Sequence, residues 1–262
     1  MIDRTELLAA YDEQLRADAE TSGAVGVRQL GPLRLATFAG GRGFVTYRDL
    51  NGADTGALRR LVTSTLAHYA ADPEIYRIEW KTRGHDQAPG LHEALVANGF
   101  VAQEPESIML GETRMLVQEV PLPPDVSLRR ITSEDDVRAM SSMSDVAFGD
   151  TPSEDTADAL LRRLALDDGT ELWVAEVGGQ VVGAGRLEPV FGADFAGIWG
   201  GATREDWRGR GIYRALTAER ARSALRMGKT LIHSDSTEHS RPILERAGLT
   251  KASTTTPYQW GR

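Results

Sequence analysis

Ten residues near the C-terminal third, WRGRGIYRAL at positions 207–216, could bind an anion. They combine Arg208 and Arg210 with Gly209 and Gly211, directly before apolar residues at helical spacing. A helix N-terminus presents N–H groups without intrahelical partners and the positive end of the helix dipole, and phosphates bind there. Glycines lack the Cβ atoms that would hold a phosphate away from the backbone. The stretch therefore predicts a phosphate-binding loop. The alternative is a solvated basic turn with a glycine hinge.

The spacing of apolar residues predicts the elements that hold this loop. In the second half of the chain we expect strands at 126–131, 172–177, 181–188, 195–203 and 230–236, helices at about 134–148, 156–166, 212–226 and 240–247, and final strands to Trp260. Gly178-Gly179 predicts a hairpin turn, and Gly248-Leu249 ends the last helix. The candidate loop thus lies between the strand at 195–203 and the helix at 212–226.

The first half predicts a similar order of elements. We expect a helix over 4–20, strands at 25–29, 33–38 and 43–48, a helix after the turn at 51–55, a strand at 75–81, a helix at 91–98 and a strand at 107–110. Gly99-Phe100 ends the short helix as Gly248-Leu249 does, at an offset of 149 residues. Prolines stiffen a linker at 121–125. The pattern predicts a repeat with domains at 1–120 and 121–262. The alternative is chance similarity between two α/β segments.

Composition limits the classes of function. The chain has 262 residues, 41% hydrophobic, and no cysteine, which excludes disulfides, thiol nucleophiles and zinc–thiolate sites. The five histidines lack the helical i, i+4 pairing of common metal sites, so we expect no metal. A net charge of −8 argues against a nucleic-acid partner. No apolar run approaches a membrane span and no signal peptide is visible, so we expect no membrane partner and a cytoplasmic protein.

The spacing Arg208-x-x-Gly211 between a strand and a helix resembles the pyrophosphate loop of the GNAT superfamily of N-acetyltransferases. The order of elements over 126–262 is also similar to that family. The resemblance implies an α/β (α+β) fold with two mixed-sheet domains in tandem, each a central, mostly antiparallel sheet flanked by helices. The first half resembles a degenerate repeat without the loop, an arrangement similar to that of the mycothiol synthases.

The same resemblance implies a co-substrate, acetyl-CoA, in a cleft where the strands at 195–203 and 230–236 splay. Backbone amides at the end of the first of these strands would hold the pantetheine and polarise the thioester, and amides of the loop would bind the pyrophosphate. Ser240, which by default caps the short helix, lies in a region where the family contacts pantetheine. The implied binding residues are Gly201, Ala202, Thr203, Arg208, Gly209, Arg210, Gly211, Ile212, Tyr213 and Ser240.

Three positions depart from the family pattern. The motif usually ends in glycine or alanine, and here that position is Tyr213, whose side chain must turn away from the phosphates. The position of the family's tyrosine, which protonates the departing thiolate, is Leu244. The position of its carboxylate base is Gly197. Both usual catalytic groups are therefore missing from these positions.

Substitutes for the missing groups can be named. Glu188 would lie opposite 196–197 across the turn at 191–194, although a solvated glutamate at a hairpin end explains it as well. His233 and Asp235 lie two apart on one strand and share a face. A histidine and an aspartate near a cleft could move protons through water. Polar residues that end a strand and cap the next helix are the alternative.

The combined prediction is an N-acetyltransferase that moves an acetyl group from acetyl-CoA to a primary amine by direct attack in a ternary complex. The alternative is a non-catalytic acyl-CoA binding or sensing module. A P-loop nucleotide site is disfavoured, because Ile212-Tyr213 stands where a lysine and serine would follow the glycines. The acidic helices over 133–166 suit a small-molecule or peptide amine as acceptor. Examples are a cationic polyamine, an aminoglycoside and a lysine side chain. A solvated helix face explains the acidity equally. The acids are Asp145, Asp150, Glu154, Asp155, Asp158, Asp167 and Asp168.

Overall fold

The computed structural model describes residues 2–262, and the backbone forms two compact units. The N-terminal unit consists of Asp3–Ile108, Asp235–Glu238 and Lys251–Arg262. The C-terminal unit consists mainly of Met109–Ser234 and His239–Thr250. The domains predicted at 1–120 and 121–262 are continuous segments, whereas these units are not, because the last strand of the chain joins the first half.

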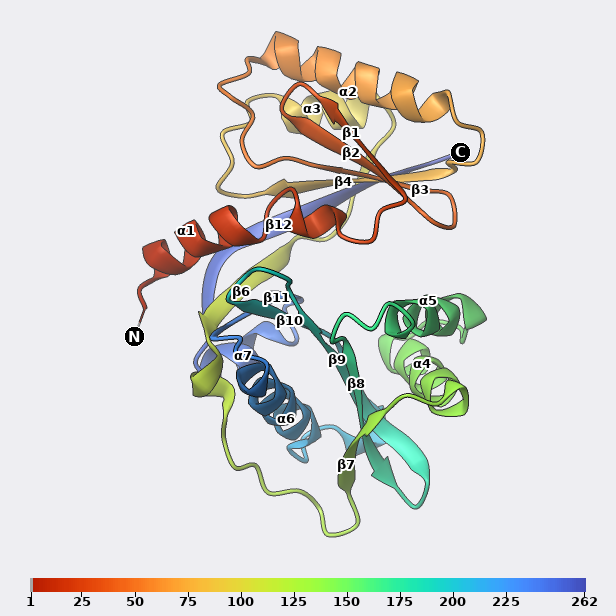
Figure 1. Ribbon diagram of the computed structural model, residues 1–262, viewed down its shortest axis with the longest axis vertical. Coiled ribbons are helices and arrows are strands. Elements are labelled where there is room, and N and C mark those ends of the chain that lie inside the picture. The colour runs from red at the N-terminus through yellow and green to blue at the C-terminus, as the bar shows by residue number, and fades with distance from the viewer. Residues whose placement is uncertain (1) are drawn as a thin grey trace. The chain divides into compact units, whose positions relative to one another are not determined.

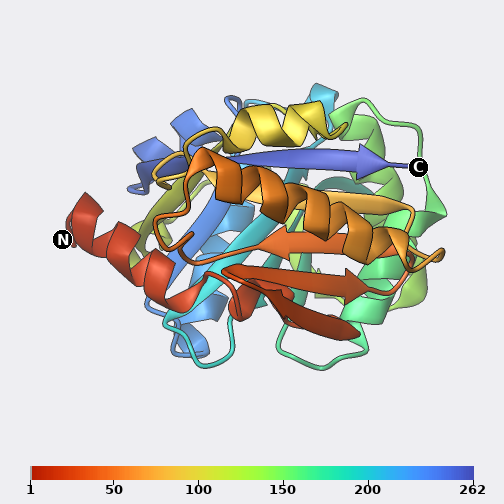
Figure 2. The same cartoon turned by 90° about the horizontal axis from the view of Figure 1, so that it is seen from above.

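The N-terminal unit is a sheet covered on one face by two helices (Figures 1 and 2). Its strand order is β1-β2-β3-β4-β12, with β5 also paired to β12. Only the β3–β4 pair is parallel among the pairs within this unit. The elements are α1 (Arg4–Gln14), a 3-10 turn (Ala19–Thr21), β1 (Gly26–Leu30), β2 (Leu33–Phe38), β3 (Arg42–Thr46), α2 (Thr55–Ala70), β4 (Arg77–Arg83), α3 (Leu91–Ala97), β5 (Val101–Ala102) and β12 (Thr250–Gly261).

Two expectations for this unit were wrong. The helix predicted over 4–20 ends at Gln14, because Ala17 adopts a φ of 60°, which no helix continues through. The expected final strands are one continuous strand, β12, and Tyr258 of β12 pairs with Trp80 of β4. The core of the unit lies between the sheet and α2 and α3, and includes Leu58 and Leu95.

The C-terminal unit is a sheet with helices on both faces (Figure 1). Its strands follow the order β11-β10-β9-β8-β7, and only β10–β11 is parallel among these pairs. The helices α6 and α7 cover one face, and α4 and α5 cover the other. The elements are β6 (Glu106–Glu112), which both units share, a 3-10 turn (Thr113–Leu116), β7 (Ser127–Ile131), α4 (Glu134–Phe148), α5 (Glu154–Leu164), β8 (Glu171–Val177), β9 (Gln180–Pro189), β10 (Phe195–Thr203), a 3-10 turn (Glu205–Trp207), α6 (Ile212–Arg226), β11 (Leu231–Ser236) and α7 (Arg241–Arg246).

The two units repeat one order of elements, as the sequence predicted. Each has a three-strand antiparallel meander, a long helix, a strand parallel to the third meander strand, and a short helix. The short helices end alike, since the backbone N–H of Phe100 donates to Leu95 at 3.1 Å and that of Leu249 donates to Leu244 at 3.0 Å. The intervening glycine, Gly99 or Gly248, has a positive φ in both.

No helix in residues 2–262 is long and apolar enough to cross a membrane.

A buried charge network lies inside the N-terminal unit. The Glu20 carboxylate forms an ion pair with the fully buried Arg83 side chain and lies 3.8 Å from the Lys81 ammonium. Burial raises the pKa of Glu20, but the positive charges of Arg83 and Lys81 and a hydrogen bond from Thr46 outweigh this, so the pKa lies below its ordinary value. Removing one partner of such a pair leaves an uncompensated buried charge.

We predict that Glu20→Gln destabilises the protein by about 3 kcal/mol at neutral pH, because Arg83 loses its counter-ion. A lowered carboxyl pKa contributes stability above the unfolded-state pKa of about 4.3, and this contribution is lost as the pH falls through the lower folded-state pKa. The urea midpoint of the wild type should therefore drop between about pH 5 and about pH 3 more steeply than that of the variant. The exposed Glu104→Gln is the matched control. If the urea midpoints of wild type and Glu20→Gln fall equally steeply with decreasing pH, Glu20 is not a stabilising anion.

Candidate functional site

The head of α6 is formed by two glycines in left-handed conformations. Gly209 has a φ of 76° and Gly211, which precedes the first helical residue, has a φ of 83°. No side chain caps this helix. The amides of Ile212 to Arg214 are therefore left to other acceptors, because the first turn of a helix has no carbonyls for them.

Every other long helix carries its own cap. Among residues 2–262, the five helices of at least eight residues are α1, α2, α4, α5 and α6, and α6 alone begins without a side-chain acceptor. In α2, which holds the corresponding place in the N-terminal unit, the Asp54 carboxylate accepts from the Ala57 amide at 2.7 Å. A carboxylate of the chain thus occupies the anion position in α2, whereas the position is open in α6.

The two arginines of the loop are exposed and brace it. Arg208 donates to the carbonyls of Thr203 at 3.2 Å and Ala147 at 2.9 Å. Arg210 donates to the Asp206 carbonyl at 3.0 Å and lies over the Trp207 ring, 4.6 Å from its centroid. Their charge lies at the loop as predicted, but part of their donor capacity holds the backbone in place.

A β-bulge interrupts β10 just before the loop. Trp199 pairs with Arg186 and Ala202 pairs with Ala184, so two residues, 200 and 201, face the single residue between their partners. Gly200 has a φ of 58°, a conformation that glycine adopts without strain. A bulge leaves backbone groups outside the strand ladder. Sequence reasoning named Gly201 but missed the bulge, and the paired glycines inside a strand were its signal.

The strands β10 and β11 are paired over a short stretch only. Their parallel ladder runs from Phe195 and Leu231 to Gly197 and His233, whereas β10 continues to Thr203 against β9. Beyond this ladder Thr203 holds a buried hydroxyl oxygen without a hydrogen-bond partner. A buried hydroxyl without a partner is costly.

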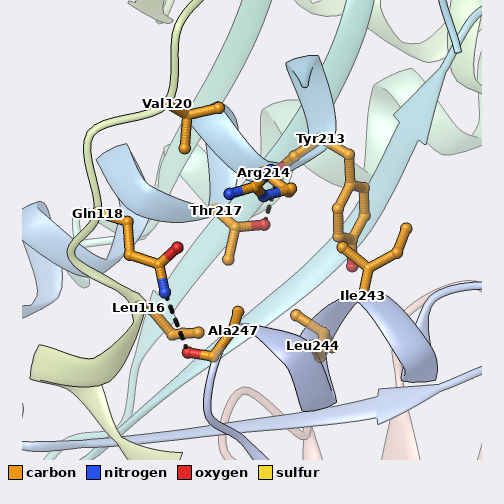
Figure 3. Close-up of a pocket in the computed structure, with 9 residues that line it drawn as sticks. All are labelled: Leu116, Gln118, Val120, Tyr213, Arg214, Thr217, Ile243, Leu244 and Ala247. Carbon is orange, nitrogen blue, oxygen red and sulfur yellow. Dashed lines mark hydrogen bonds between the residues drawn. The ribbon is translucent and has the colours of Figure 1, made fainter. Parts of the chain in front are cut away.

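A small pocket opens between α6, α7 and the linker that follows β6 (Figure 3). It is lined by Leu116, Gln118 and Val120 of the linker, Tyr213, Arg214 and Thr217 of α6, and Ile243, Leu244 and Ala247 of α7. The Gln118 amide reaches the Ala247 carbonyl at 3.5 Å across it. Leu244 is fully buried and packs in the core against α6 and β10.

Tyr213 points from the first turn of α6 toward β10 and α7. A Cβ atom at Gly201 would lie 2.5 Å from its ring, so the ring rests directly on the bulge. Burial raises the pKa of the Tyr213 phenol, while the charge of Arg220 and a hydrogen bond with Ser240 oppose the rise. The Ser240 side chain does not cap α7. It forms a hydrogen bond with Tyr213 instead.

The linker approaches the head of α6, which the sequence did not indicate. A Cβ atom at Gly211 would lie 3.2 Å from both the Val120 side chain and the Pro121 carbonyl. The linker is held along the helix by Arg222, which donates to the Gln118 carbonyl at 2.7 Å. A side chain at position 211 would therefore crowd the linker as well as any bound phosphate.

The opposite face of the sheet carries the candidate proton acceptors in one row. Glu188 pairs with Gly197 across β9 and β10, as predicted, and His233 pairs with Gly197 from β11. The Glu188 carboxylate accepts from Arg186 at 2.6 Å. The His233 ring packs edge-on against Trp199, with ring centroids 5.1 Å apart. Two candidate bases therefore flank the glycine that stands at the family's carboxylate position.

Trp199 folds over Gly197 and shields that position. A Cβ atom at Gly197 would lie 2.3 Å from the indole nitrogen, so only glycine leaves room for the ring.

Asp235, the other candidate, belongs to the N-terminal unit, where its carboxylate accepts from Lys81 at 2.7 Å. This ion pair holds the Asp235 side chain against β4 of the N-terminal unit.

The acidic helices α4 and α5 neutralise much of their own charge. Arg138 forms ion pairs with Glu134, Glu154 and Asp158. Arg163 pairs with Asp168 at 2.8 Å. These pairs reduce the attraction that the acids would exert on a cationic acceptor.

Among residues 2–262, no group of three or more His, Asp and Glu side chains is arranged to hold a metal ion.

Solved structures share this fold over most of the chain. A GCN5-related N-acetyltransferase from Kribbella flavida has a TM-score of 0.66 at 15% identity, covering 98% of this chain and 93% of that one. A tandem GNAT protein from the clavulanic acid biosynthesis pathway has a TM-score of 0.62 at 15% identity, covering 87% and 78%. A GCN5-related N-acetyltransferase from Sphaerobacter thermophilus has a TM-score of 0.63 at 17% identity, covering 88% and 76%. At these identities the likeness establishes the fold.

No curated protein sequence matches the chain significantly. The model of the acetyltransferase (GNAT) family matches residues 137–249, which include the bulge, the loop, α6 and α7. Over residues 137–249 the chain is thus similar to the acetyltransferase (GNAT) family.

Proposed function

We propose that the protein transfers an acetyl group from acetyl-CoA to a primary amine, with its site in the C-terminal unit. The observation that carries the proposal is the uncapped head of α6, where Gly209 and Gly211 leave backbone amides open to an anion. The pyrophosphate of acetyl-CoA suits this place, because oriented amides and the helix dipole together favour a phosphate. Arg208 and Arg210 add positive charge beside it.

The residues next to the loop fit the rest of the co-substrate. The pantetheine would run from the loop along the end of β10, past the unpaired Thr203 hydroxyl, to the bulge at Gly200 and Gly201. The Tyr213 ring forms the floor under Gly201 and turns toward α7, which leaves its own amide available to the phosphate. Ser240 forms a hydrogen bond with Tyr213 beside this path.

Transfer at this site requires no covalent enzyme intermediate. The amine nitrogen attacks the thioester carbon, the carbonyl oxygen gains negative charge, and the carbon–sulfur bond then breaks to release the thiolate of CoA. A fixed amide donor at the bulge would stabilise that oxyanion by roughly 3 kcal/mol. Holding amine and thioester together supplies much of the remaining acceleration.

The proton of the attacking amine needs an acceptor. Glu188 and His233 lie on either side of Gly197, on the face opposite α6, and we propose that the amine approaches along this row. The Glu188 carboxylate binds Arg186 at 2.6 Å, and the His233 ring packs against Trp199.

A non-catalytic acyl-CoA binding module is the second candidate. It is favoured by Leu244, which is fully buried where the family has its tyrosine, and by Trp199, which covers Gly197. Release of free CoA from acetyl-CoA, measured with a panel of small amines and lysine peptides, separates the two functions. Amine-dependent release supports transfer, whereas binding without release by any amine supports the module.

Acetyl-CoA should protect the protein against thermal unfolding, because a ligand that binds only the folded state stabilises it. At one hundred times the dissociation constant the gain is about 2.7 kcal/mol, which corresponds to a rise of several degrees in Tm. A thermal melt with and without acetyl-CoA measures it. Adenosine serves as the control ligand, since it lacks the phosphates. An unchanged Tm at saturating acetyl-CoA would refute the proposed site.

Gly211→Val should weaken acetyl-CoA binding by about 2–4 kcal/mol, because the new side chain crowds the head of α6 and displaces the amides from the phosphate. It should also lower the Tm, since its φ of 83° disfavours valine. Calorimetric titration measures the affinity for acetyl-CoA, and a thermal melt without ligand measures the Tm.

Gly228→Val is the matched control for this variant. Gly228 follows the other end of α6, has a φ of 77°, and has open space where a Cβ would lie. It should lower the Tm and leave the affinity for acetyl-CoA unchanged. If Gly211→Val melts early but binds acetyl-CoA as tightly as the wild type, the loop is a hinge and not a phosphate site.

A further inference from the structure

One arginine of α6 is buried without a carboxylate partner. Arg220 is 1% exposed, and among residues 2–262 no Asp or Glu forms an ion pair with it. Its guanidinium donates to the carbonyls of Arg186 at 3.2 Å and Trp199 at 3.3 Å, and to the Thr217 hydroxyl at 3.2 Å. A fourth bond reaches the Leu216 carbonyl at 3.1 Å. The charge is therefore held by neutral oxygen atoms alone.

These contacts place the guanidinium directly behind the bulge. Arg186 and Trp199 form the last β9–β10 pair before the register shifts, and Arg220 binds the carbonyls of both. Gly185 is the single residue that faces the bulge, and a Cβ atom there would lie 2.6 Å from the guanidinium. The absence of a side chain at Gly185 is what makes room for the arginine.

A buried charge of this kind is costly, so its position requires a reason. Transfer of an unpaired cation into the protein interior is unfavourable unless its donors are satisfied. Burial lowers the pKa of Arg220 to about 10, the phenol of Tyr213 opposes this, and the charge of Arg186 adds to it. The guanidinium therefore remains charged at neutral pH. Apolar residues would fill the same space without this cost.

Its orientation suits the chemistry proposed for the bulge. The carbonyls of Arg186 and Trp199 are drawn toward α6, which fixes the peptide planes at the point where the ladder opens. A fixed cation behind this backbone also favours negative charge on a group held in front of it. The head of the same helix carries the phosphate loop, so α6 aligns both ends of the co-substrate.

We propose that Arg220 is a positioning residue that holds the β10 bulge in the form that binds the acetyl-thioester end of the co-substrate. This inference rests on the proposed function. Arg220 touches the backbone of the bulge and not the substrate. Its loss should therefore affect the thioester end of the ligand and spare the phosphate end, a distinction that a general loss of packing does not produce.

Two probes separate the two ends of the ligand. Acetyl-CoA needs both the loop and the bulge, whereas 3′-phosphoadenosine 5′-diphosphate carries the phosphates and lacks the pantetheine and thioester. We would compare Arg220→Lys, which keeps the charge but not the fork of donors, and Gly185→Ala, which displaces the guanidinium and keeps the arginine. Arg226→Met, exposed at the end of α6, is the control. Binding is measured by calorimetry at a temperature where melts show every variant folded.

We expect both test variants to lose about tenfold or more in affinity for acetyl-CoA, which is the size of a lost charge-assisted hydrogen bond. Their affinity for the nucleotide should fall by less than about twofold. Arg226→Met should bind both probes like the wild type. Equal losses for the two probes, or none for acetyl-CoA, would overturn the role of Arg220 while leaving the proposed function intact. A wild-type protein that binds neither probe would overturn the proposed function, and this inference with it.

Discussion

The close packing of α6 against β9 and β10 is the constraint on which the candidate site depends. Side chains of α6 reach the strands where the strands have glycine: Tyr213 rests on Gly201, and Arg220 lies against Gly185. The Ile212 side chain occupies the space beside Gly183 in the same way. One rigid helix thus presents open amides at its head and supports the bulge with its flank. A displacement of α6 would disturb both together.

The two units show how one order of elements can serve two purposes. In the N-terminal unit the helix after the meander begins with Asp54, whose carboxylate accepts the Ala57 amide. In the C-terminal unit the corresponding helix begins with Gly211, which offers no acceptor. A carboxylate at a helix head satisfies the same amides that a phosphate would bind. The head of α2 is therefore capped by a side chain of the chain itself, and the same unit contains the buried Glu20 and Arg83 network.

Much of the fold could be predicted from local patterns, because these depend on residues close together in sequence. The hairpin at Gly178-Gly179, the helix caps, and the pairing of Glu188 with Gly197 follow from turn length and alternation. The glycine turn before α6 could be predicted because its glycines and the helix are adjacent in sequence. The end of the first helix at Gln14 was not readable, since nothing in its apolar spacing marks the positive φ at Ala17.

The remaining features depend on contacts between distant residues. The pairing of β12 with β4, the approach of Val120 to Gly211, and the ion pair of Asp235 with Lys81 each join segments far apart in the chain. The spacing of apolar residues along the chain does not predict such contacts. The strand pattern likewise does not predict that the Trp199 side chain packs over Gly197.

The central claim is that the head of α6 binds the phosphates of acetyl-CoA and the head of α2 does not. Amide hydrogen exchange resolved to single residues tests it most directly, since it reports protection of individual N–H groups. With saturating acetyl-CoA, exchange should slow by about tenfold or more at Ile212–Arg214 and stay unchanged at Thr55–Ala57. Exchange at Ile212–Arg214 that is unaffected by acetyl-CoA, or equal protection at Thr55–Ala57, would contradict the account.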